Sequence, residues 1–150
     1  MSDARKVAEF VELRSADEKV PQICARTTLH FERGETVAIH TDDPAEAEAI
    51  DDQLWSFRQN SFVPHVRRDE ADEPVIEAVV IFGGTPSGLT ADVLVVASAE
   101  EAPEWAGAFA HVYDFAHVYD EALRNAARRR FAAYKKAGYR MRFIKPESQD

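Results

Sequence analysis

Residues 120–139 read DEALRNAARRRFAAYKKAGY, and this stretch carries the clearest fold signal in the chain. Asp120 suits a helix N-cap, because its carboxylate accepts hydrogen bonds from the free backbone N–H groups of a first turn. Gly138 follows Lys135 and Lys136, and glycine readily adopts the left-handed conformation that ends many helices. The stretch therefore predicts a helix that is capped at both ends.

Two faces of this predicted helix differ in chemistry. Four residues fall on one face at the helical period: Leu123, Ala127, Arg130 and Tyr134. The adjoining face repeats at i, i+4, i+7 and i+11 and holds three cations and one aromatic ring: Arg124, Arg128, Phe131 and Lys135. Such a stripe indicates a surface for an acidic partner, whereas an ordinary solvated helix face is the alternative.

The charge distribution supports an acidic partner at this end of the chain. The formal net charge is −9, which argues against general affinity for nucleic acid. Residues 1–120 contain 9 Lys and Arg against 24 Asp and Glu, whereas residues 121–150 contain 9 against 3. The local charge is thus −15 followed by +6. A change of sign on an acidic protein predicts where an acidic partner docks.

Length and composition predict one globular domain over residues 1–150, with a polar tail at 146–150. The chain has 45% hydrophobic residues, which is enough for a substantial core. Cys24 is the single cysteine and excludes an internal disulfide. No apolar run suggests export or membrane insertion, so the expected location is the cytoplasm.

Hydrophobic patterns predict strands and helices in alternation. Strands are expected at residues 6–13, 35–41, 75–82, 92–97 and 139–145, and helices at residues 18–33, 43–55, from 103 onward and from 120 onward. This order predicts an α/β three-layer sandwich with a mostly parallel sheet of about five strands flanked by about four helices. No helix separates residues 75–82 from 92–97, so those strands are expected to be either antiparallel or distant.

The hexapeptide FAHVYD occurs twice in succession, at residues 109–114 and 115–120. The pattern of Trp105, Phe109 and Val112 places it inside the helix expected from residue 103. Six residues are not a helical period, so the two copies are expected to present different faces. The interpretation is a local duplication that lengthens a turn between two helices.

Residue chemistry predicts neither a cofactor nor a metal. The Gly-rich loop at 83–88 connects two strands, whereas a phosphate cradle leads into a helix. The five histidines lack metal-ligand spacing, and Cys24 lies on an apolar stripe, as a buried residue would. An enzymatic or nucleotide-binding α/β domain remains an alternative, although the helix starts at Asp43 and Pro103 carry acidic residues.

Apolar residues also gather around Trp55. Phe62, Val63 and Pro64 follow within a segment that Pro64 forces out of helical conformation. Such a segment can fold over the core, or it can form the rigid aromatic knob of a protein–protein hot spot.

Three motifs resemble a known family: LW at 54–55, SFVPH at 61–65 and ARxxFxxYKxxGY at 127–139. Together they are similar to the chi subunit of bacterial DNA polymerase III, and the order of elements agrees over nearly the whole chain. The resemblance implies a Rossmann-like, non-catalytic accessory subunit of the clamp-loader assembly within the DNA polymerase holoenzyme.

The resemblance also implies two binding surfaces. One surface binds the psi subunit or a repair helicase, and its matching residues are Trp55, Phe62, Val63 and Pro64. The other binds the acidic C-terminal tail of single-stranded DNA-binding protein, and its matching residues are Arg124, Arg128, Phe131, Lys135 and Gly138. DNA is then contacted only indirectly. Direct DNA binding by the basic helix is the remaining alternative.

Overall fold

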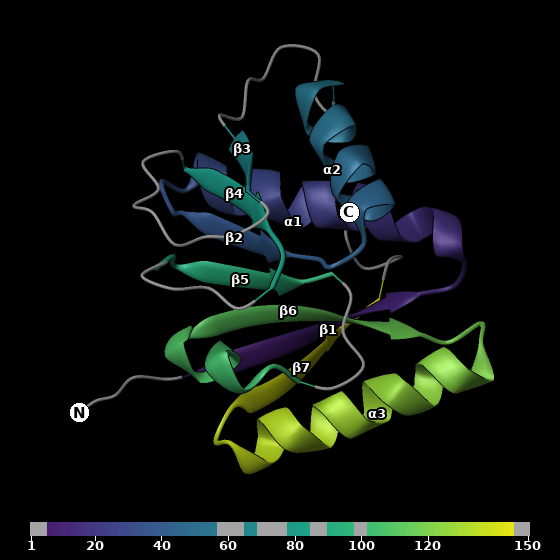
Figure 1. Cartoon of the computed structure of the whole chain (residues 1–150). Helices are drawn as coiled ribbons and strands as arrows, with labels where there is room; N and C mark the ends of the chain where they lie inside the picture. The colour runs from purple at the N-terminus through teal and green to yellow at the C-terminus, as the bar shows by residue number, and fades with distance from the viewer. Residues whose placement is uncertain (1–5, 57–64, 69–77, 85–89, 98–101, 146–150) are drawn as a thin grey trace.

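A seven-stranded sheet with the order β3-β4-β2-β5-β6-β1-β7 organises the computed structural model of the chain (Figure 1). The structure describes residues 6–56, 65–68, 78–84, 90–97 and 102–145, so the expected tail at 146–150 lies outside the described residues. Every strand pairing in these ranges is parallel. The strands are β1 Val7–Leu13, β2 Val37–His40, β3 His65–Arg68, β4 Val79–Phe82, β5 Val93–Val96, β6 His111–His117 and β7 Arg140–Ile144.

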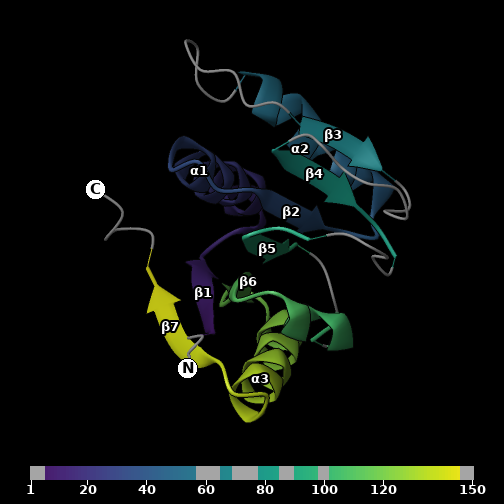
Figure 2. The ribbon, with the colours of Figure 1, turned by 90° about the vertical axis from the view of Figure 1, so that its left-hand side faces the viewer.

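Helices cover both faces of this sheet. The α-helices are α1 Lys19–Glu32, α2 Pro44–Ser56 and α3 Glu121–Lys136, and the short 3-10 helices are η1 Ala16–Glu18 and η2 Glu104–Ala108. Helices α1 and α2 lie on one face, and α3 lies on the other (Figures 1 and 2). The predicted three-layer α/β sandwich is confirmed. The described residues form seven strands and three α-helices, against about five and about four expected.

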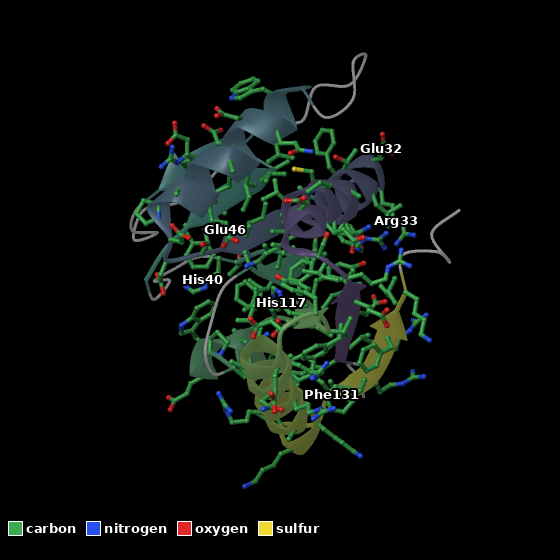
Figure 3. All side chains as sticks on the ribbon, turned by 90° about the vertical axis from the view of Figure 1, so that its right-hand side faces the viewer. Glu32, Arg33, His40, Glu46, His117 and Phe131 are labelled. Carbon is green, nitrogen blue, oxygen red and sulfur yellow. The ribbon has the colours of Figure 1, made fainter. Side chains whose placement is uncertain are left out.

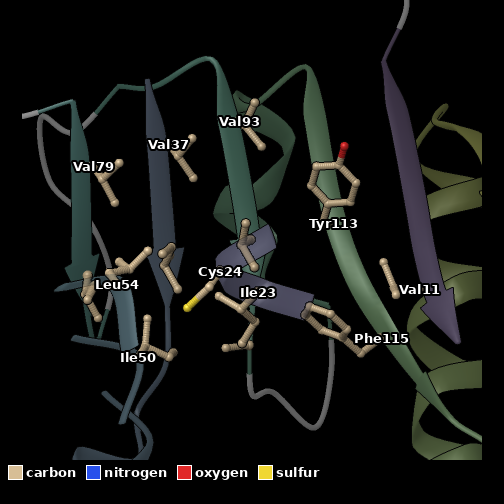
Figure 4. Packing of buried hydrophobic residues seen from close by; sticks show 14 of the residues in the cluster. Val11, Ile23, Cys24, Val37, Ile50, Leu54, Val79, Val93, Tyr113 and Phe115 are labelled. Atoms are coloured by element: carbon tan, nitrogen blue, oxygen red, sulfur yellow. The ribbon is translucent and has the colours of Figure 1, made fainter. Parts of the chain in front are cut away.

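The core has two layers because successive residues of a strand point to opposite faces of the sheet. Val37 and Ile39 of β2 pack toward α1 and α2, where Cys24 and Ile50 are also buried (Figure 4). Ala38 lies in the opposite layer with Tyr134 of α3. The predicted strands at 75–82 and 92–97 appear as β4 and β5, whose residues are all buried, as expected for a parallel sheet covered on both faces.

The prediction of a helix from residue 103 onward was wrong. Only η2 is helical there, and the repeated hexapeptide supplies β6, which pairs with both β1 and β5. Aromatic and β-branched residues favour this strand. Because the strand period is two, positions six residues apart share a face, so the two copies are in phase. Asp114 of the first copy packs against α3, whereas Asp120 of the second caps α3.

The expectation for the strands at 75–82 and 92–97 is met by its second alternative. Strands β4 and β5 do not pair with each other, because both pair with β2, which lies between them. The edge strand β3, which pairs with β4, is not among the strands that the sequence pattern predicted. Edge strands often carry charged residues, so the charges at this position obscured the strand.

Candidate functional site

Helix α3 is held in a defined position at both ends. The Asp120 carboxylate accepts a hydrogen bond from the Leu123 N–H at 3.0 Å, as the predicted N-cap requires. At the other end, Gly138 has φ of 102°, and the N–H groups of Gly138 and Tyr139 donate to the carbonyls of Lys135 and Tyr134. These two bonds form a Schellman motif. The side chains of α3 are therefore presented at fixed positions.

A buried ion pair anchors the inner face of α3 to β6. The Arg130 guanidinium donates to both carboxylate oxygens of Asp114, at 2.8 and 3.0 Å, and the Tyr134 hydroxyl donates to the same carboxylate at 3.0 Å. Asp114 is 1% exposed and Arg130 is 5% exposed. Burial and the nearby Asp114 charge raise the pKa of Tyr134. Sequence periodicity placed Arg130 on one face with Ala127 and Tyr134, but it could not identify Asp114 as its partner.

The outer flank of α3 borders a pocket of about 300 Å³. The lining residues come from α3, β1, β7 and the β6 region: Phe10, Ala116, Val118, Arg124, Ala127, Arg128, Phe131 and Phe143. The Phe131 ring lies 5.4 Å from Phe10 and 6.0 Å from Phe143, centroid to centroid. In Figure 3, Phe131 lies on the side of α3 that faces β7. The pocket therefore has an aromatic floor.

Two arginines at this pocket carry charge without a carboxylate partner among the described residues. Arg124 Nη1 donates to the Val118 carbonyl at 2.8 Å, and Arg128 Nη1 donates to Asn125 Oδ1 at 3.4 Å. Arg124 is half-buried and Arg128 is exposed. An acidic group entering the pocket can therefore bind either guanidinium without displacing a carboxylate of the described residues.

Three of the five predicted residues on this side converge. Arg124, Arg128 and Phe131 line one pocket, whereas Lys135 and Gly138 are not among its lining residues. Lys135 is exposed on the following turn. Gly138 has the capping role already described.

The surface predicted around Trp55 is only partly described. Trp55 lies in the last turn of α2 with 56% of its surface exposed, so this side chain is not buried in the core. Phe62, Val63 and Pro64 lie outside the described residues.

A larger crevice of about 720 Å³ opens at the carboxyl ends of the strands, beside the first half of α3. Ligands of parallel α/β sheets bind at such positions, so an enzymatic or nucleotide-binding domain would use it. Lys19 Nζ lies 2.7 Å from a Glu46 carboxylate, and Arg130 is paired with Asp114. Burial lowers the pKa of His117 to about 4. Among the described lining residues, only Arg129 adds an exposed cation, and such a lining offers little to a phosphate.

Sequence reasoning missed a polar cluster beneath α1. The Tyr113 hydroxyl donates to His30 Nε2 at 2.7 Å, and His30 Nδ1 donates to Glu35 at 2.6 Å. His111 Nε2 lies 2.6 Å from a Glu9 carboxylate oxygen, and that hydrogen bond lowers the pKa of Glu9. These residues are far apart in sequence, so no local motif reveals the cluster. No group of three or more His, Cys, Asp or Glu side chains in the described ranges is arranged to hold a metal ion.

Cys24 is fully buried, as predicted, and burial raises the pKa of its thiol to about 12. Such a thiol stays protonated and unreactive near neutral pH. Within the described residues, no helix is both long and apolar enough to cross a membrane.

Comparisons with known proteins agree on one family. The family model described as DNA polymerase III chi subunit, HolC, matches residues 6–142. DNA polymerase III subunit chi of Pseudomonas aeruginosa is 31% identical over 134 residues, which are 87% of this chain and 90% of that protein. The same subunit of Escherichia coli K12 is 29% identical over 119 residues, which are 79% of this chain and 80% of that protein.

A solved structure supports the fold alone. The crystal structure of T4 UvsW superposes with a TM-score of 0.65 at 11% sequence identity. The match covers 96% of this chain and 42% of that chain.

Proposed function

Because the chain belongs to the DNA polymerase III chi subunit family, we propose that it is a non-catalytic accessory subunit of the clamp-loader assembly. In this role it links the polymerase to single-stranded DNA-binding protein by binding that protein's acidic C-terminal tail. The pocket between α3 and β7 carries the proposal, because it combines an aromatic floor with two arginines that lack a carboxylate partner among the described residues.

The chemistry of the pocket suits an acidic peptide that ends in an aromatic residue. The terminal carboxylate binds Arg128 through a charge-assisted, bidentate hydrogen bond. The terminal ring rests on Phe131, and Arg124 contributes a second positive charge beside the carboxylate. Lys135 extends the positive charge by one turn and speeds association with an acidic peptide. An interface of this size predicts affinity in the micromolar range and a strong dependence on salt.

A charge reversal tests the proposal. Arg128→Glu raises the Kd for a labelled tail peptide at least about tenfold, because it removes a charge-assisted bond and adds a repulsion. Arg129→Glu is the matched control: it makes the same charge change on the neighbouring residue, which lines the other crevice. Fluorescence anisotropy at low and moderate salt measures both. Equal affinity of the two variants contradicts the proposal.

The same titration separates direct DNA binding from tail binding. An oligonucleotide without single-stranded DNA-binding protein should show no affinity comparable to that of the tail peptide, since the chain is acidic overall. Tight oligonucleotide binding that is lost in Arg128→Glu would identify the basic face of α3 as a DNA-binding surface instead.

The surface at Trp55 binds the second partner, the psi subunit or a repair helicase. An exposed tryptophan at a helix end is the residue type most enriched in hot spots. Trp55→Ala should weaken capture of that partner while leaving tail binding unchanged, because Trp55 does not line the pocket beside α3. If Trp55→Ala lost both partner capture and tail binding, the proposal of two separate binding surfaces would be contradicted.

A further inference from the structure

Phe143 is the most exposed of the large hydrophobic residues on the described surface. It is 59% exposed, compared with 56% for Trp55, 41% for Leu123 and 40% for Tyr119. It lies on β7, which pairs only with β1 in the described part of the sheet. Edge strands that expose aromatic rings invite unwanted association, so such a ring is typical of a binding surface.

The ring of Phe143 is nevertheless held in a defined position. Its Cα lies opposite that of Phe10 in the parallel pairing of β1 and β7, which directs both side chains to the α3 face. The Phe143 ring lies 6.0 Å from that of Phe131, at an interplanar angle of 29°, and 6.3 Å from that of Phe10. One side of the ring is therefore supported by the protein, and much of the remainder is open to solvent.

Phe143 borders the same pocket as Arg124 and Arg128. A ligand whose carboxylate binds an arginine there places the adjoining apolar group among aromatic rings. An aromatic ring of the ligand gains ring–ring contacts here, which stabilise it beyond the burial of apolar surface. An aliphatic group of similar size gains only the burial of apolar surface. The lining thus favours flat rings over branched aliphatic side chains.

We propose that Phe143 is a specificity-determining residue of this pocket: it forms a wall that receives the terminal aromatic ring of an acidic peptide and disfavours aliphatic termini. This inference rests on the proposed function, because it takes the peptide tail as the ligand. It adds a residue of β7 to a site otherwise built from α3 and the adjoining strands.

Two labelled acidic peptides test the inference. They are identical except that one ends in Phe and the other in Leu, and both keep a free terminal carboxylate. The full-length protein should bind the Phe peptide about two- to tenfold more tightly than the Leu peptide. Phe143→Leu should reduce this ratio to about one, since it keeps apolar area but loses the ring, and Phe143→Tyr should restore it.

Leu123→Ala is the control, because Leu123 is also an exposed apolar side chain but lines the other crevice. It should leave the ratio unchanged. Partial unfolding of a variant lowers the apparent affinity for both peptides by the same factor, so it does not change the ratio of the two affinities. An unchanged ratio in Phe143→Leu overturns the inference while the proposed function stands. Failure of the unmodified protein to bind either peptide overturns the proposed function itself.

Discussion

Removal of the Asp114 carboxylate should be among the most destabilising single changes in the described part of this fold. In Asp114→Ala, the Arg130 guanidinium loses both of its carboxylate bonds while remaining buried between α3 and the sheet. The Tyr134 hydroxyl and the Phe115 N–H lose an acceptor in the same step. Three kinds of donor are thus left without the carboxylate at once.

The magnitude follows from the burial of the pair. Breaking a buried ion pair from one side costs about 3–5 kcal/mol, because the remaining charge loses its carboxylate counter-charge. The Arg130 bond to the Phe115 carbonyl, at 3.2 Å, remains and keeps the cost from being larger. In a domain of this size, each kcal/mol lowers Tm by about 2–4 °C, so the expected loss is about 6–20 °C.

Urea unfolding followed by circular dichroism measures this change. Arg129→Met is the matched control, since its side chain is exposed beside Arg130, and it should change the free energy of unfolding by less than about 0.5 kcal/mol. The double variant Asp114→Leu with Arg130→Met should recover most of the loss, because neither charge is then left alone. A loss below about 1 kcal/mol in Asp114→Ala, or a double variant as unstable as the single one, would refute the reasoning.

Three further predictions concern the helix end, the pH dependence and the second surface. Gly138→Ala should lower the free energy of unfolding by about 1 kcal/mol, because its φ of 102° disfavours a Cβ although no atom obstructs one; Gly138→Asn should cost less in the same urea titration. Stability should fall between pH 6.5 and about 4, because burial, together with the Lys19 and Arg130 charges, lowers the pKa of His117. Between these pH values His117 is protonated in the unfolded chain but not in the folded one, so the free energy of unfolding decreases as the pH falls. His117→Gln should reduce this dependence of the free energy of unfolding on pH. Trp55→Ala should alter Tm little, yet weaken partner capture by about 2 kcal/mol or more in pull-down titrations.

Local signals in the sequence predicted much of the fold. Local composition and spacing were enough to predict features that depend on nearby residues. These are the N-cap of α3 at Asp120, the end of α3 at Gly138, and the buried strands β4 and β5. The short edge strand β3 was missed because its pairing with β4 is long-range, and local residue chemistry favoured a loop. The hexapeptide was assigned to a helix because Trp105, Phe109 and Val112 fit a helical stripe, whereas pairing with β1 and β5 decides its conformation.

The candidate site was predictable only where it lies on one helix. Arg124, Arg128 and Phe131 recur at helical spacing, so the sequence places them together. Phe10 and Phe143 come from other strands, and only the register of β1 with β7 brings them to Phe131. In the sequence, Phe143 is only an aromatic residue in a charged edge strand. Its place in the pocket became apparent once the structure showed Phe10 and Phe131 beside it.

The central claim is that the pocket between α3 and β7 recognises both the charge and the terminal ring of an acidic tail. Fluorescence anisotropy of a labelled tail peptide, with and without its last aromatic residue, tests this most directly. We expect micromolar binding of the complete peptide and a loss of at least about tenfold without the ring, because the aromatic floor then has no ligand. Equal affinity of the two peptides would contradict the account and leave only a nonspecific attraction to the basic face of α3.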